Sequence, residues 1–212
     1  MVKKGIATLP VTVSNDKALE IFRLLAEVNR TIGGMKSEFG HSILKDAMVS
    51  MLSLNESVQS TRIEGTQVTF PDMVEARDSE NLSWEITEVL NYQKALQQGV
   101  SSIKTGNSIS TSLIIELHRI LMENASGANA SGGEFRKIQN FIGPTNRIED
   151  AVYIPVDANE IDGYMENLEF FINGTPHSSF RKFNKTDGFV FDEECDPIIK
   201  ACLLYTSDAA DE

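Results

Sequence analysis

Two side chains that could do chemistry lie one turn apart near the end of a predicted helix. Ser60 supplies a hydroxyl and Glu64 a carboxylate, and their spacing of four residues places both on one helix face. Gly65 follows, and glycine commonly ends a helix. The negative end of the helix dipole disfavours a carboxylate there by up to about 1 kcal/mol, and the residues that follow are neutral. Taken alone, the pattern is more typical of a solvated glutamate at a frayed helix end.

Composition narrows the classes of protein that this chain can represent. Its 212 residues are enough for one large or two small domains, and 41% hydrophobic residues is ordinary for a globular protein. A formal net charge of −12 argues against a nucleic-acid-binding surface. Cys195 and Cys202 form neither a disulfide framework nor a metal-binding pair. Without an apolar run of signal-peptide or bilayer length, we expect a cytoplasmic protein that does not bind membranes.

Apolar residues recur at helical spacing along most of the sequence. An extended arm over residues 1–13 is followed by a helix that should end at Gly33-Gly34. Further helices are predicted over residues 42–65, 82–103 and 110–121, and a turn or a new helix start is predicted around residues 71–78. Another helix follows Asn159 and ends at Gly174, and a last one begins at Pro197. Two short β-type runs, 137–142 and 151–156, predict a hairpin with a long loop, and residues 175–192 read as irregular. The fold class is therefore mainly α with one inserted β-hairpin.

Residues 56–66 resemble the inhibitory-helix motif of Fic-family proteins, [Ser/Thr]-x-x-x-Glu-[Gly/Asn], and Ser60, Glu64 and Gly65 match it position by position. The resemblance extends to about residue 201, because the helices containing residues 88–92 and 117–122 are similar to the first helices of the family's catalytic domain. It implies a Fic-like helical bundle. Its parts would be an N-terminal helical region (1–80) and the front part of the catalytic domain (81–201).

The same resemblance implies a flap, a β-hairpin that holds a target protein by main-chain pairing. Gly133 and Arg136 resemble the family's Gly-x-[Phe/Tyr]-Arg segment. The residues implied for target binding come from both predicted strands, here called the flap segment (residues 137–156): Gln139, Asn140, Phe141, Ile142, Tyr153, Ile154 and Pro155.

The family reaction is AMP transfer from ATP to a protein hydroxyl, with magnesium, carried by a His-Pro-Phe-x-[Asp/Glu]-Gly-Asn-Gly-Arg loop. None of His41, His118 and His177 stands in such a loop, so we assign no catalytic residue and no metal ligand. We expect His41 at the surface and His118 in a structural role on its helix. ATP and Mg²⁺ are expected in the intact protein only, with no productive binding to this chain.

The last eleven residues, 202–212, differ from the rest of the sequence. Residues 202–212 resemble the translation of a sequencing-library adapter, and we expect them to be non-native and the fold to be C-terminally incomplete. The alternative is a natural acidic tail.

Together these features predict the N-terminal fragment of a self-inhibited protein adenylyltransferase, itself inactive. Glu64 would pair with the catalytic loop's arginine and occupy the place of the ATP γ-phosphate, with Ser60 bonding nearby. The partners would be a protein substrate modified on Ser, Thr or Tyr, or the protein itself, and a homo-oligomer is compatible with this. One alternative is a non-catalytic helical module that binds proteins at the hairpin edge. A DNA-linked regulator is a second alternative, which the acidity opposes.

Overall fold

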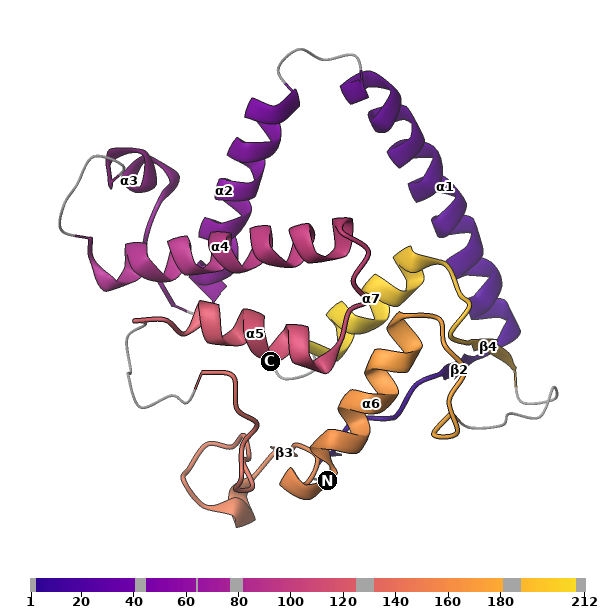
Figure 1. Cartoon of the computed structure of the whole chain (residues 1–212). Coiled ribbons are helices and arrows are strands. Elements are labelled where there is room, and N and C mark those ends of the chain that lie inside the picture. The colour runs from indigo at the N-terminus through magenta and orange to yellow at the C-terminus, as the bar shows by residue number, and fades with distance from the viewer. Residues whose placement is uncertain are drawn as a thin grey trace. The chain divides into compact units, whose positions relative to one another are not determined.

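The structure is a computed structural model and is mainly α-helical, as predicted (Figure 1). It separates into two compact units, residues 34–134 and residues 1–33 with 135–212, which are described one at a time. The residues that it describes are 3–40, 45–63, 65–76, 82–124, 132–180 and 188–208.

The unit of residues 34–134 is built from α2 (Lys45–Ile63), α3 (Phe70–Glu75), α4 (Trp84–Lys104) and α5 (Thr111–Leu121). Serine side chains cap two of these helices. Ser83 accepts a hydrogen bond from the Ile86 amide at 3.3 Å, and Ser110 accepts one from the Leu113 amide at 3.2 Å. The predicted starts of α4 and α5 are thus confirmed to within two residues.

An apolar cluster holds α2, α3 and α4 together, and Phe70 and Ile86 pack against it. Its buried members are Leu54, Val58, Val68, Met73 and Val89. The α4 and α5 helices run alongside each other in Figure 1. They approach closely at Gly99, where a Cβ would stand 3.2 Å from the Leu117 side chain.

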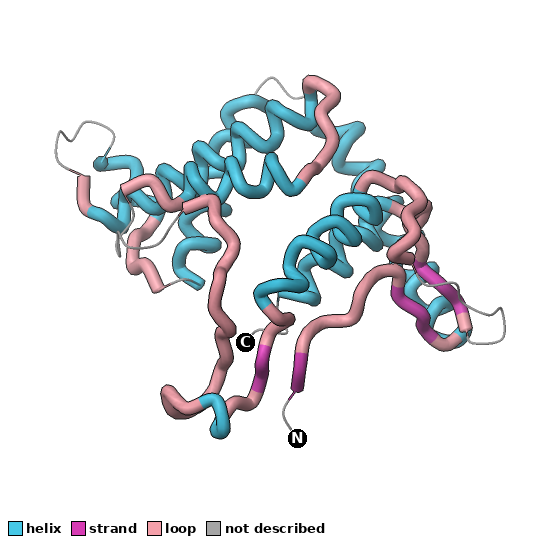
Figure 2. The backbone as a smooth tube through the Cα atoms, turned by 60° about the horizontal axis from the view of Figure 1, so that its bottom comes forward, coloured by secondary structure: helices cyan, strands magenta, loops and turns pink. Residues whose placement is uncertain are grey.

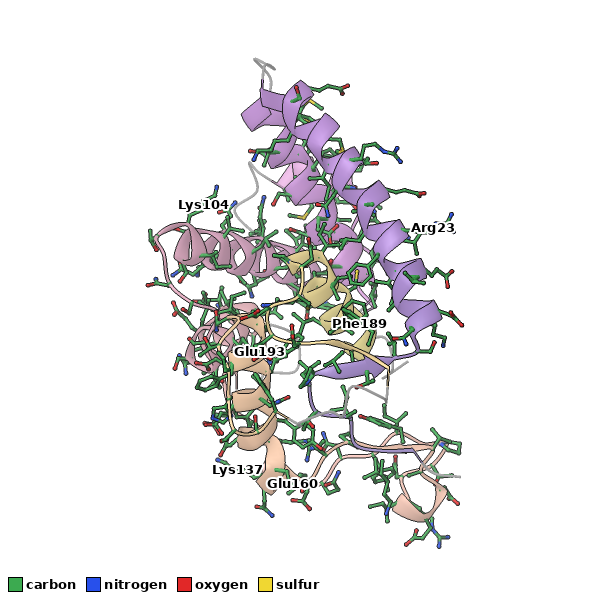
Figure 3. The ribbon with its side chains drawn as sticks, turned by 90° about the vertical axis from the view of Figure 1, so that its right-hand side faces the viewer. Arg23, Lys104, Lys137, Glu160, Phe189 and Glu193 are labelled. Atoms are coloured by element: carbon green, nitrogen blue, oxygen red, sulfur yellow. The ribbon has the colours of Figure 1, made fainter. Side chains whose placement is uncertain are left out.

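The second unit combines short strands with three longer helices. They are α1 (Asn15–Gly40), most of which belongs to this unit, α6 (Ile161–Ile172) and α7 (Pro197–Asp208). Strand β2 (Val11–Val13) pairs antiparallel with β4 (Phe189–Phe191). Figure 3 shows Phe189 beside the first turns of α1, where its ring lies 5.2 Å from that of Phe22. The cluster of Ala18, Phe191 and Ile199 buries the contact between these elements.

The predicted end of the first helix at Gly33-Gly34 is wrong, since α1 continues to Gly40. Neither glycine has a positive φ, so neither adopts the left-handed conformation that ends many helices. A glycine inside a helix lowers stability by about 0.5–1 kcal/mol relative to alanine. That loss is too small to end a long helix. The division into two units nevertheless falls between these two glycines.

The predicted antiparallel pairing within the flap segment is reduced to a single bridge, between Ile142 and Tyr153. Residues 137–142 are not a strand. The second run contributes the two-residue strand β3 (Tyr153–Ile154), which pairs in parallel with β1 (Lys3–Lys4) from the start of the chain (Figure 2). Two single-turn helices, η2 (Ile148–Asp150) and η3 (Ala158–Glu160), lie on either side of β3 in the sequence.

A search of the described helices for one both long and apolar enough to cross a membrane finds none.

Candidate functional site

The end of α2 carries the predicted inhibitory motif, and its backbone geometry fits the sequence expectation. Gly65 has φ +100°, a conformation that strongly favours glycine. The Gly65 amide donates to the Arg62 carbonyl at 3.1 Å, and the Thr66 amide donates to the Thr61 carbonyl at 3.2 Å. These two bonds form the pair that closes a Schellman-type helix end. The predicted stop of the helix at Gly65 is therefore confirmed.

A set of buried hydroxyls fixes which face of α2 is turned inward. Ser57, Thr61 and Thr66 are each at most 5% exposed. Ser57 donates to the Ser53 carbonyl at 2.9 Å and Thr61 to the Ser57 carbonyl at 3.0 Å, so both hydroxyls are satisfied by their own helix. Val58 is buried in the same stripe. The inward face of α2 is thus fully used for packing, and Ser60 falls outside it.

Ser60 lies at the border of the exposed face, half-buried, and its hydroxyl has a specific partner. It donates to the Glu56 carboxylate at 3.0 Å. Glu56 lies four residues before Ser60, and this spacing on one helix face is the sequence signal for the contact. Glu64 lies outside the described residues, so the predicted pairing of Ser60 with Glu64 stays a prediction.

Gly133 lies near the end of the helical unit and is hydrogen-bonded to a side chain of α5. Its amide donates to Nδ1 of His118 at 2.8 Å, so this histidine holds the loop, in line with the structural role expected for it. Gly133 is buried with φ +77°, and a Cβ there would stand 3.0 Å from the Ile115 carbonyl oxygen. Both observations require glycine at this position of the Gly-x-[Phe/Tyr]-Arg segment.

Side chains replace the backbone ladder that was predicted for the flap segment. The Arg136 guanidinium donates to the carbonyls of Val156 and Ile138, and the Gln139 side-chain amide donates to the Pro155 carbonyl at 3.0 Å. Because these carbonyls already accept from side chains, they do not need the main-chain partners of a second strand. This is the physical reason for the missing strand at residues 137–142.

The remaining flap residues are placed as follows. Ile142 and Tyr153 exchange backbone bonds, with the Ile142 amide 2.9 Å from the Tyr153 carbonyl oxygen. Phe141 is half-buried and Asn140 is exposed, and the Asn140 carbonyl accepts from the Gln139 side chain. The structure thus brings Gln139 and Ile142 against residues 153–155, as predicted, but through one bridge and side-chain contacts.

His177 is held in a local turn, and nothing around it resembles a catalytic loop. Its Nδ1 accepts from the Ser179 amide at 3.2 Å, its Nε2 lies 3.4 Å from a Glu166 carboxylate oxygen, and its ring packs 4.2 Å from that of Phe170. His41 lies outside the described residues.

The described residues were searched for a cluster of metal-ligating side chains and for pockets. They contain no group of three His, Cys, Asp or Glu side chains that could hold a metal ion. A pocket of about 130 Å³ in the second unit is lined by three phenylalanines and by Asp192 and Asp196, whose charge is wrong for phosphate. In this pocket, burial raises the pKa of the Cys195 thiol.

Comparison with known families identifies the helical region. Residues 22–101 match the family described as Fic/DOC family N-terminal, a stretch that includes α2, α3 and most of α4. No curated protein matches the chain. Residues 22–101, less than half of the chain, therefore resemble the N-terminal region of Fic/DOC proteins, and this region is helical in the structure.

Proposed function

We propose that this chain is the regulatory front of a self-inhibited protein adenylyltransferase, an enzyme that transfers AMP from ATP to a Ser, Thr or Tyr hydroxyl of a protein. The observation that supports it is the motif's position. The family match spans α2, Gly65 follows the end of this helix with a positive φ, and Ser60 lies on the accessible border of α2. A helix end of this kind can present polar side chains to another part of the protein, because its inward face is already occupied by packing.

Charge repulsion would be the inhibitory mechanism. With Glu64 paired to the catalytic loop's arginine, its carboxylate would stand where the ATP γ-phosphate must lie. Two unit negative charges 4 Å apart repel each other by about 4 kcal/mol at an effective dielectric constant of 20. That repulsion would suffice to keep ATP from binding productively. The Ser60–Glu56 contact would hold the Ser60 side chain in place beside it.

The residues of this chain supply the inhibitory side of the site. Mg²⁺ and the phosphates would be held by the family's catalytic loop and not by Ser60 or Glu64. We propose a cytoplasmic protein that modifies a partner protein or itself, and a homo-oligomer fits this proposal.

A second candidate is a non-catalytic module that binds a protein at the edge of the flap segment. The observation that favours it is β3, a short strand that already pairs with a segment distant in sequence.

The test compares the product of the intact source gene with its Glu64→Gly variant. Incubation with labelled ATP and Mg²⁺ should transfer more label to protein in the variant. A Glu75→Gly variant, altered at another helical glutamate of the same unit, is the matched control and should behave as wild type. Equal labelling by the wild type and Glu64→Gly would exclude the inhibitory role of this motif.

A further inference from the structure

Strand β3 has neighbours along both edges. On one edge, the Tyr153 amide and carbonyl pair with Ile142. On the other edge lies β1, with Lys3 opposite Tyr153 and Lys4 opposite Ile154, and the Gly5 amide donates to the Ile154 carbonyl at 2.8 Å (Figure 2). The outer edge of the flap segment is therefore filled by the start of the same chain.

The segment that fills this edge, residues 3–8, makes few stabilising contacts with the rest of the unit. Of residues 4–8, none is buried, and the Ile6 side chain is 42% exposed. The first firm attachment comes at Leu9, whose amide and carbonyl both bond to the side chain of Asn167, at 2.9 and 3.0 Å. Asn167 is only 3% exposed. Because residues 4–8 contribute no buried side chain, this stretch could leave β3 while Leu9 stays anchored.

Gly5 also limits how far the pairing extends. Its φ of +59° turns the chain, and the ladder between β1 and β3 stops after two residues. A short parallel ladder without buried side chains is a weak one. The edge is consequently occupied by a segment that a better-fitting extended peptide could displace.

We propose that residues 3–5 act as an intramolecular plug of the β3 edge, where an extended segment of a partner protein would otherwise add as a strand. The proposal rests on the proposed function for its biological meaning, since the partner is the protein to be modified or bound. The plug carries Lys3 and Lys4 in a chain of net charge −12, so we expect the edge to favour basic extended segments.

A partner peptide can bind only those molecules in which β1 is detached. Its apparent affinity is therefore its intrinsic affinity multiplied by the fraction of such molecules. Removing the plug should therefore strengthen binding of a peptide in trans without a change at the edge itself.

The experiment measures binding of a fluorescent peptide with the sequence of residues 1–8 to four forms of the whole chain. These are the wild type, a variant lacking residues 1–5, Gly5→Pro and Ala7→Pro. Proline at position 5 removes the donor to Ile154, and its ring cannot adopt the positive φ. Ala7 is exposed and lies outside the ladder, so Ala7→Pro is the matched control.

The proposal expects the deletion and Gly5→Pro to bind the peptide about tenfold or more tightly than the wild type and Ala7→Pro do. In the same variants, the Ile154 region should lose amide protection by a similar factor while α6 keeps its protection. Equal peptide affinity in all four forms overturns the proposal, as does unchanged protection at Ile154 in Gly5→Pro.

The readout uses no nucleotide, so its failure is distinguishable from failure of the proposed function. A null result with Glu64→Gly would remove the inhibitory role of α2 and leave the plug intact. Equal peptide binding would remove the plug and leave the role of α2 intact.

Discussion

The helical unit of residues 34–134 and the flap segment are stabilised in opposite ways. In the helical unit, buried apolar residues come from helices that are near neighbours in sequence, such as Val58 on α2 and Val89 on α4. The flap segment depends on the distant start of the chain, with Lys3 paired to Tyr153. The comparison shows that the first region is held by packing, and the second by a few polar contacts that can be exchanged.

The largest effect is expected in the helical core. Val89 is fully buried in the cluster that joins α2, α3 and α4. A Val89→Asp variant would bury an unpaired carboxylate and lower the free energy of unfolding by about 3 kcal/mol or more. Leu90, the next residue, is 37% exposed, so Leu90→Asp should cost far less. Urea unfolding followed by circular dichroism measures both, and equal losses would contradict the assigned core.

A smaller loss is expected from the buried asparagine of α4. The Asn91 side-chain amide donates to the carbonyl of Leu121, the last residue of α5, and to that of Glu123, which follows the helix. Asn91→Leu leaves those carbonyls without this donor and should cost about 1–3 kcal/mol. The control is Lys94→Ala, which breaks only an exposed ion pair with Glu123 and should cost under about 1 kcal/mol. Similar losses in the two variants would argue against Asn91 as the tie between α4 and α5.

Asn167 is a buried asparagine of the second unit that, like Asn91, bonds to backbone groups. Its replacement should destabilise mainly the arm that contains Leu9. Asn167→Leu removes both bonds to Leu9 and should cost about 1–2 kcal/mol. Hydrogen exchange should then accelerate at Leu9 and in β1, while α4 and α5 stay protected. If exchange in the first residues of the chain is unchanged, Asn167 does not anchor that arm.

Two glycines should respond in opposite directions to alanine. Gly65→Ala forces a Cβ into the left-handed region and should destabilise by about 1–2 kcal/mol. Gly34→Ala lies inside α1 with nothing within 4 Å of the new Cβ and should stabilise by about 0.5–1 kcal/mol. Thermal unfolding of the two variants gives the signs directly. A stabilising Gly65→Ala would refute the assigned helix end.

The smallest effect concerns pH. The Asp72 carboxylate accepts from the hydroxyl and amide of Thr69, at 2.6 and 2.8 Å, and these bonds lower its pKa below the ordinary 3.8. Because the pKa is lowered on folding, the stabilisation is complete above pH 3.8 and is lost as pH falls through the folded pKa. NMR titration of Asp72 should show a midpoint below 3.8, and Thr69→Ala should raise it. An unchanged midpoint in Thr69→Ala would rule out this cause.

The contrast between the two regions also explains what the sequence could predict. Helix starts at Ser83 and Ser110 and the stop at Gly65 follow from local capping chemistry, and all three are confirmed. The continuation of α1 past Gly33-Gly34 was not predictable from glycine alone, because both residues stay right-handed. The pairing of β1 with β3 joins residues 150 positions apart, and no local pattern marks it.

For the candidate site, the sequence located Ser60 and Gly65 and the contact of residues 139 and 142 with the second flap run. It overlooked the Ser60–Glu56 bond, although the spacing was visible. It also predicted a full hairpin, since it could not foresee that Arg136 and Gln139 would satisfy the carbonyls of the second run.

The central claim is that α2 is the inhibitory helix of an AMP-transferring enzyme. Reading the source gene through codon 201 tests it most directly. The account predicts a His-Pro-Phe-x-[Asp/Glu]-Gly-Asn-Gly-Arg loop soon after that codon, in frame with α7. A reading frame that ends at Glu212 with no such loop would contradict it and favour the alternative of a non-catalytic binding module.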